Sequence, residues 1–172
     1  QNKHKIKNGK SHKQTVFYLL QVTNKTTYFL IKYKYILFKG DFMCGIIGKA
    51  GITEVMPQLI KGLERLEYRG YDSAGIAVSN EEGKIEVIKA KGRLRVLADM
   101  TDNGKAVVGN CGIGHTRWAT HGAPTDVNSH PHYNTKETIA VVHNGIIENY
   151  VKLRKKLENK GYEFVSETDT EV

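Results

Sequence analysis

The chain contains few of the residues that build covalent or metal-based frameworks. Its 172 residues include 3 prolines, 2 cysteines and 1 tryptophan. The two cysteines, Cys44 and Cys111, cannot form a disulfide framework, so a reducing cytoplasm is the expected location. The sequence has no CxxC and no HExxH motif, which excludes the commonest patterns of zinc binding.

Long apolar runs are also missing. The runs at 16–20, 28–31 and 35–38 are broken by lysine and polar residues, and none approaches the ~18 apolar residues of a membrane span. The basic start is not followed by an uninterrupted apolar core and a small-residue cleavage site, which argues against a signal peptide. We therefore predict no membrane partner.

Acidic residues are nearly absent from the first 42 positions. This segment has nine lysines and one acid, Asp41, so it carries the whole net charge of +8. The remaining 130 residues hold equal numbers of acidic and basic side chains, so the folded part has no charge bias toward nucleic acid. We predict that 1–42 is not part of the mature protein. The alternative is a non-catalytic fragment whose basic arm binds nucleic acid or an acidic membrane surface.

The residues from Met43 onward are enough for one domain with a real core. Hydrophobic periodicity predicts an α+β fold in which antiparallel sheets are covered by helices. The predicted helices span 55–67, 93–100 and about 150–161, and Pro57 falls in the first turn of the first helix. The predicted strands span 44–51, 74–78, 85–90, 107–118, 139–142 and 162–165.

The pair Met43-Cys44 resembles the start of a protein. If a chain began at Met43 and lost this methionine, Cys44 would carry a free α-amino group beside its thiol. One residue would then supply both nucleophile and general base. The short apolar, glycine-punctuated segment that follows reads as a strand that would hold this residue in place.

Other polar residues suit a substrate that is an amino acid amide. Asn144-Gly145 offers an amide NH₂ and a backbone N–H to a developing oxyanion. Arg117 is a candidate for binding an α-carboxylate, and Asp169 could bind an α-ammonium group. Each also has an ordinary structural reading, because Asn-Gly is common in turns and a lone arginine often forms an ion pair.

Three further residue sets have simpler structural explanations. Cys111 is expected to be a small buried hydrophobe on a glycine-rich strand, and Asp72 and Glu67 to be capping or surface groups. The irregular spacing of five histidines does not match a metal site, and we predict no metal. They are His115, His121, His130, His132 and His143.

Several segments, taken in order, resemble the glutamine amidotransferase domain of the N-terminal-nucleophile class. The run LEYRGYDSAG at 66–75 is typical of the glucosamine-6-phosphate synthase branch, which uses fructose 6-phosphate, and separates it from the amidophosphoribosyltransferase and asparagine synthetase types. Those two types remain the alternatives. The matching segments are 43–48, 66–75, 115–122, 128–132, 143–149 and 166–172.

The resemblance implies a four-layer α/β/β/α sandwich, truncated at its C-terminus, and a role for each matching residue. Cys44 would be the nucleophile, and Asn144 with the Gly145 N–H would form the oxyanion hole. Arg69 would border the nucleophile, and His130 would lie toward the interface with a further domain. The residues implied to bind glutamine are Arg117, Trp118, Thr120, His121 and Asp169.

The implied reaction is hydrolysis of glutamine through a thioester, without a cofactor, and transfer of ammonia to a sugar-isomerase half that is absent from this chain. The family protein would be a homo-oligomer. Two departures affect activity. The nitrogen of Cys44 is here an internal amide, so we expect the chain to be inactive until it is trimmed. The domain over 43–172 is also expected to be incomplete.

Overall fold

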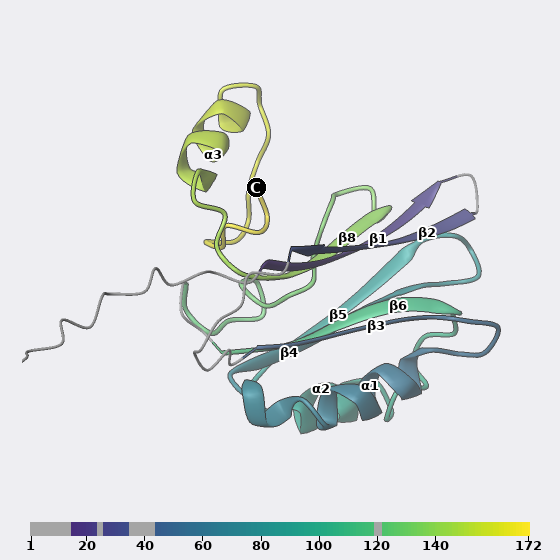
Figure 1. The fold of residues 1–172 in the computed structure, drawn as a ribbon. Coiled ribbons are helices and arrows are strands. Elements are labelled where there is room, and N and C mark those ends of the chain that lie inside the picture. Colours follow the sequence, from purple (N-terminus) through teal and green to yellow (C-terminus); the bar gives the residue numbers. More distant parts are fainter. Residues whose placement is uncertain (1–14, 24–25, 35–43, 119–121) are drawn as a thin grey trace, which may run out of the picture.

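Two four-stranded antiparallel sheets lie face to face, and helices α1 and α2 cover the outer face of one of them (Figure 1). A computed structural model describes residues 15–23, 26–34, 44–118 and 122–172. The first sheet has the order β3-β6-β4-β5 and the second sheet the order β2-β1-β8-β7. The predicted α+β architecture with facing sheets is therefore confirmed.

The first sheet contains four strands of similar length, and its two central strands are buried along their whole length. Glycines in β6 admit helix α1, because Gly112 and Gly114 leave room for Leu59 and Leu63. A Cβ at Gly112 would lie 2.8 Å from Leu59 Cδ1. The strands are β3 (Gly45–Ala50), β4 (Ser73–Ser79), β5 (Ile85–Lys91) and β6 (Cys111–Arg117).

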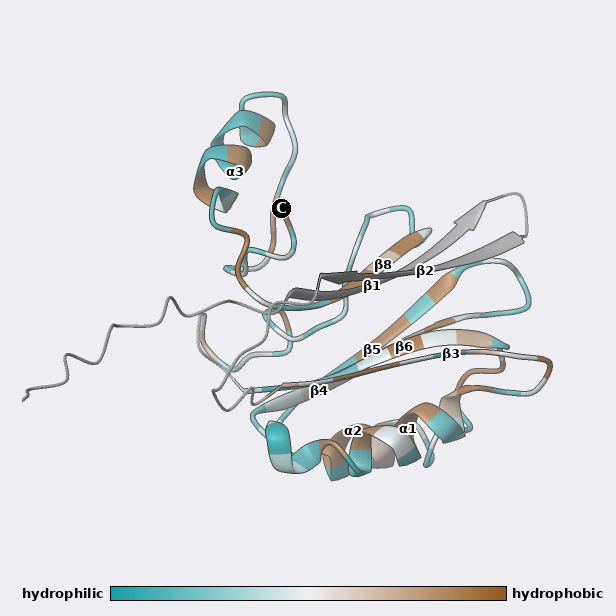
Figure 2. Cartoon of the chain, viewed as in Figure 1, coloured by the Kyte–Doolittle hydropathy of each residue, from teal (hydrophilic) through white to brown (hydrophobic). Residues whose placement is uncertain are grey.

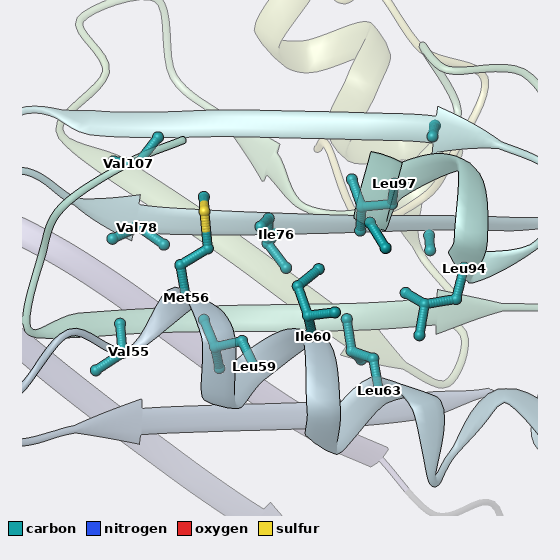
Figure 3. Packing of buried hydrophobic residues seen from close by; sticks show 13 residues of the cluster. Val55, Met56, Leu59, Ile60, Leu63, Ile76, Val78, Leu94, Leu97 and Val107 are labelled. Atoms are coloured by element: carbon teal, nitrogen blue, oxygen red, sulfur yellow. The ribbon is translucent and has the colours of Figure 1, made fainter. Parts of the chain in front are cut away.

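Helices α1 (Met56–Glu64) and α2 (Leu94–Met100) bury their apolar sides against this sheet. Figure 2 shows hydrophobic and hydrophilic residues alternating along both helices, as an amphipathic helix requires. Figure 3 shows Leu59, Ile60 and Leu63 of α1 in the same cluster as residues of β4 and α2. Burying a leucine or isoleucine side chain stabilises a fold by roughly 1.5–3 kcal/mol, so this cluster is the main core.

A smaller apolar cluster lies between the two sheets. It includes Cys111 and Ile113 of β6 and Ala140 and Val142 of β8. Cys111 is 4% exposed, so its predicted role as a small buried hydrophobe is confirmed. Glu67 is also the predicted capping group, because its Oε1 accepts the N–H of Leu94 at the start of α2 over 3.0 Å.

The second sheet contains strands from both ends of the sequence. Strand β8 (Ile139–Asn144) pairs on one side with the two-residue strand β7 (His132–Tyr133) and on the other with β1 (Thr15–Thr23). Strand β2 (Thr26–Lys34) completes a hairpin with β1. The segment predicted to lie outside the mature protein thus contributes two strands, and its removal stays a prediction.

Helix α3 (Tyr150–Glu158) follows β8 and stands away from the two sheets in Figure 1. The segment after α3 returns to the sheet, where His143 Nδ1 lies 3.1 Å from the hydroxyl of Thr170. No helix in the described part of the chain is long and apolar enough to cross a membrane.

One predicted strand is absent from the described residues, and some predicted boundaries were wrong. Helix α1 stops at Glu64 and is followed by a 3-10 turn, η1 (Glu67–Arg69). The strand predicted over 107–118 begins only at Cys111. Residues 162–165 do not form a strand. Instead, Glu171 accepts the backbone N–H groups of Val165 and Ser166, at 2.8 and 2.7 Å, which replaces pairing with a neighbouring strand.

Candidate active site

Cys44 lies where the start of β3 meets the end of β6. The pairing of Gly45 with Thr116 brings Cys44 alongside Trp118, whose backbone N–H donates a hydrogen bond to Cys44 Sγ over 3.2 Å. Glycine at position 45 permits this approach, because a Cβ there would lie 2.6 Å from Leu66 Cβ and 2.8 Å from Thr116 Oγ1. The register of two strands therefore places the thiol beside a hydrogen-bond donor.

Opposing influences act on the acidity of this thiol. Burial raises the pKa of Cys44, and the negative charge of Asp72 acts in the same direction. The Trp118 N–H and the positive charge of Arg117 lower the pKa of Cys44, but burial has the largest effect. A thiol with a raised pKa needs a nearby base to become a nucleophile at neutral pH.

The carboxamide of Asn144, at the end of β8, faces Cys44 from the second sheet. Asn144 Nδ2 donates to the backbone oxygen of Cys44 over 3.1 Å, and Asn144 Oδ1 lies 2.8 Å from Nε2 of His115. Gly145 has a φ of 149°, which is in the region that favours glycine. The structure thus brings two of the predicted site residues, Cys44 and Asn144, into direct contact.

Arg117 interacts electrostatically with both Cys44 and Asp169. Burial lowers the pKa of Arg117, while the negative groups of Cys44, Asp72 and Asp169 raise it. Asp169 Oδ2 also accepts the N–H of Ile147 over 2.6 Å. A buried cation and a fixed carboxylate at one site could bind the two charges of an amino acid, and these roles stay predictions.

The remaining predicted residues differ in what the structure shows of them. Trp118 is next to the thiol, and its ring packs edge-on against Tyr71 at 5.2 Å. Thr120 and His121 lie outside the described residues. Arg69 donates from Nε to the Tyr68 hydroxyl over 3.0 Å, so its expected position beside the nucleophile stays a prediction.

Two residues near Cys44 were not assigned a site role from sequence. Asp72 was interpreted as a capping or surface group, but its charge acts on both Cys44 and Arg117. His115 was considered only as one of five histidines. The sequence signal for Asp72 is its position just before the buried strand β4, and the signal for His115 is its place directly after the apolar, glycine-rich first half of β6.

Three of the histidines form a buried cluster between the sheets. The ring of His130 stacks on that of His115, with centroids 4.5 Å apart, and meets the ring of His132 edge-on at 4.6 Å. His130 is 6% exposed in this cluster, and its expected place toward an interface with a further domain stays a prediction. Among the described residues, no three His, Cys, Asp or Glu side chains could hold a metal ion together.

Burial sets the protonation state of this cluster. It lowers the pKa of His115 to about 4 and that of His132 to about 3, and the pKa of His130 well below its usual value. Neighbouring positive groups act in the same direction: Lys89 lowers the pKa of His132, and the other two histidines lower the pKa of His130. All three rings are therefore neutral at pH 7 in the folded chain.

We predict that the protein loses stability as the pH falls below about 6.5. In the unfolded chain these histidines take up protons near pH 6.5, whereas in the folded chain His115 and His132 remain neutral until about pH 4 and 3. Their contribution is fully present above pH 6.5 and is lost as the pH falls toward the folded values. At pH 5 the loss is about 2 kcal/mol for each of these two residues.

Urea unfolding at pH 7.5 and pH 5 measures this change. The matched variant is His132→Gln, which cannot titrate but keeps an amide where His132 Nε2 lies 2.8 Å from Thr168 Oγ1. Its stability should fall by about 2 kcal/mol less than that of the wild type between the two pH values. An identical fall in both proteins would contradict the prediction.

Known proteins with similar sequence and structure point to one kind of domain. Residues 99–172 match the family described as the glutamine amidotransferase domain. Over 130 residues the chain is 61% identical to the glutamine--fructose-6-phosphate aminotransferase (isomerizing) of Clostridium acetobutylicum and 64% identical to that of Clostridium perfringens. These alignments cover 76% of this chain and 21% of each relative, so the chain spans about a fifth of their length.

Solved structures with lower sequence identity to this chain also include an amidotransferase. A glutamine phosphoribosylpyrophosphate amidotransferase from B. subtilis, complexed with ADP and GMP, has a TM-score of 0.61 and 32% identity over 73% of this chain and 27% of its own. A structure titled as the allosteric regulatory enzyme of purine biosynthesis has a TM-score of 0.60 and 33% identity, with the same coverage. The predicted resemblance is confirmed by both sequence and structure.

Proposed function

This chain carries a glutamine amidotransferase domain, and we propose that its Cys44 thiol hydrolyses glutamine to glutamate and ammonia once the α-amino group of Cys44 is free. One observation carries the proposal. The Trp118 N–H reaches Cys44 Sγ over 3.2 Å, while Asn144 Nδ2 reaches the backbone oxygen of the same cysteine over 3.1 Å. A nucleophile and a potential oxyanion donor therefore meet from two different sheets.

The chemistry follows from these groups. The α-amino group of Cys44 accepts the thiol proton, and sulfur attacks the side-chain amide carbon of glutamine. Negative charge develops on the amide oxygen, where Asn144 Nδ2 and the Gly145 N–H stabilise it. The protonated amine then donates to the leaving nitrogen, the C–N bond breaks, and ammonia departs. Water hydrolyses the remaining thioester, which yields glutamate and restores the thiol.

Arg117 and Asp169 supply substrate binding in this proposal. Arg117 binds the α-carboxylate of glutamine through its guanidinium, and Asp169 binds the α-ammonium group. Thr120, His121 and Trp118 complete the pocket, with Arg69 at its border. The electrostatic coupling of Arg117 to both Cys44 and Asp169 supports this assignment.

The proposed acceptor in the whole protein is fructose 6-phosphate. The relatives at 61% and 64% identity carry that substrate in their names, whereas the phosphoribosylpyrophosphate amidotransferase from B. subtilis is 32% identical. The higher identity favours glucosamine 6-phosphate synthesis over the purine or asparagine alternatives.

We further propose a cytoplasmic homo-oligomer, in which 1–42 is absent from the mature enzyme and 43–172 is the glutaminase domain. The alignments with these relatives span 130 of the 172 residues, which agrees with a domain shorter than the whole chain.

An electrophilic glutamine analogue tests the proposal directly. In a chain cut immediately before Cys44, we expect a glutamine-like diazoketone to add one label to Cys44, because this thiol has hydrogen-bonding and charged partners in a site for glutamine. Cys111, 4% exposed in the core, should remain unlabelled. Peptide mass spectrometry locates the label.

Competition and a matched variant make this result specific. Excess glutamine should slow the labelling of Cys44, and Cys111→Ser should label like the wild type. A folded, cut chain in which neither cysteine reacts, or in which glutamine gives no protection, would refute the proposed function.

A further inference from the structure

One hydrogen bond joins the two sheets directly at the candidate active site. His115 lies on β6 of the first sheet, between strands β3 and β4, and is 1% exposed. Asn144 ends β8 of the second sheet. His115 Nε2 and Asn144 Oδ1 are 2.8 Å apart, so the side chain of a buried histidine reaches the carboxamide that faces the nucleophile.

The surrounding contacts decide which atom donates. Asn144 Nδ2 lies 3.1 Å from the backbone oxygen of Cys44, which only accepts hydrogen bonds. The NH₂ group of Asn144 must therefore point at Cys44, and its carbonyl oxygen must point at His115. Because that oxygen is also an acceptor, the ring of His115 carries its proton on Nε2.

The rest of the His115 ring supports this arrangement. Its Nδ1 is buried without a hydrogen-bond partner among the described residues, which is the state expected of an unprotonated nitrogen facing other side chains. Stacking on His130 at 4.5 Å and 26° fixes the plane of the ring. The bond to Asn144 is the side-chain hydrogen bond described for this ring, and a hydrogen bond to the backbone of His143 also acts on its pKa.

We propose that His115 is a positioning residue for glutamine hydrolysis, which holds the Asn144 carboxamide so that its NH₂ group faces the reacting centre. This inference rests on the proposed function of Cys44. Without the Nε2–H donor, the Asn144 carboxamide keeps its bond to the backbone oxygen of Cys44 but loses the bond at its own oxygen, so it is held less firmly. A carboxamide turned by half a rotation would place its oxygen toward the developing negative charge, and one of the two oxyanion donors would be lost.

Two amide substitutions separate positioning from simple space filling. The side-chain nitrogen of glutamine reaches about as far as histidine Nε2, whereas that of asparagine reaches about as far as Nδ1. In chains cut before Cys44, His115→Gln should retain most of the activity. His115→Asn should lower kcat for glutamine hydrolysis by about 10²-fold with little change in KM, because the oxyanion donor acts mainly in the transition state. Equal kcat losses in both variants, or a change confined to KM, would overturn the inference.

A double-mutant cycle asks whether His115 acts through Asn144. Asn144→Ala removes the donor itself, so adding His115→Asn to that variant should cause no further loss of kcat. Two losses that multiply would show that His115 acts independently. Thermal unfolding of each variant confirms that the compared proteins are folded.

A measurement that needs no activity separates this inference from the proposed function. Long-range ¹H–¹⁵N NMR spectra should show His115 as the Nε2–H tautomer in the wild-type chain. The Nδ1–H tautomer would overturn the inference even in an active enzyme. A cut wild-type chain with the Nε2–H tautomer but no hydrolysis of glutamine would instead refute the proposed function.

Discussion

Cutting the chain immediately before Cys44 is expected to raise its rate of glutamine hydrolysis by about 10²–10⁴-fold, the usual contribution of a general base. In the intact chain the nitrogen of Cys44 is an amide, which cannot accept the thiol proton. Burial also raises the pKa of the thiol, so little thiolate forms unaided at neutral pH. Glutamate release before and after cleavage at an introduced protease site measures the gain.

The position of the new amine provides the control. A chain whose protease site leaves one additional glycine before Cys44 has a free amine, but not on the cysteine. It should remain as slow as the uncut chain, and Cys44→Ala should be inactive whether cut or not. Full activity of the uncut chain would contradict the self-based mechanism. Because β1 pairs with both β2 and β8, the cut chain should be assayed with this hairpin still present.

Replacing Gly75 with alanine is expected to destabilise the fold by about 2–3 kcal/mol, as overpacking of a core does. Gly75 lies in β4, opposite His115 in the register of β4 and β6. A Cβ at this position would lie 2.1 Å from the backbone oxygen of His130. Backbone atoms cannot move aside as a flexible side chain can, so the segment carrying His130 must shift.

Gly51→Ala is the matched control, because a Cβ there would meet only Lys49 Cε at 3.8 Å. Urea unfolding should show a loss of stability for Gly75→Ala and almost none for Gly51→Ala. The first variant should also weaken the stacking of His130 on His115, and with it the activity of the cut chain. Equal stability of the two variants would contradict the packing argument.

The sequence predicted best those helices and strands whose buried side follows from a periodic pattern within the element itself. The alternating runs that became β4 and β5, and the helical spacing of Leu59 and Leu63, each match one structural element. Strand β7 was not predicted, because two residues carry no periodic pattern and its existence depends on pairing with β8. The same dependence explains the error at 162–165, where the backbone N–H of Val165 bonds to the side chain of Glu171 and not to a neighbouring strand.

The residues of the candidate site also differ in whether a short sequence motif was enough to predict them. Cys44 and Asn144 were predicted from motifs that each occupy a few consecutive residues. The bond between His115 and Asn144 joins positions 29 residues apart, and it depends on how two sheets face each other. The effect of Asp72 on the Cys44 thiol likewise requires the register of β4 and β6. Neither relation can be deduced from a single sequence without the fold.

The ladder between β3 and β6 has a consequence for oxidation. Gly45, next to Cys44, pairs with Thr116 at one end of the ladder, and Ala50 pairs with Cys111 at the other. At about 3.3 Å per residue the two sulfur-bearing residues are ~20 Å apart, far beyond the 7 Å limit for a disulfide. In a chain cut before Cys44, where the α-amino group can accept the thiol proton, peroxide should therefore convert Cys44 to a sulfenic acid or to a mixed disulfide with an external thiol, and a mild reductant should reverse either change.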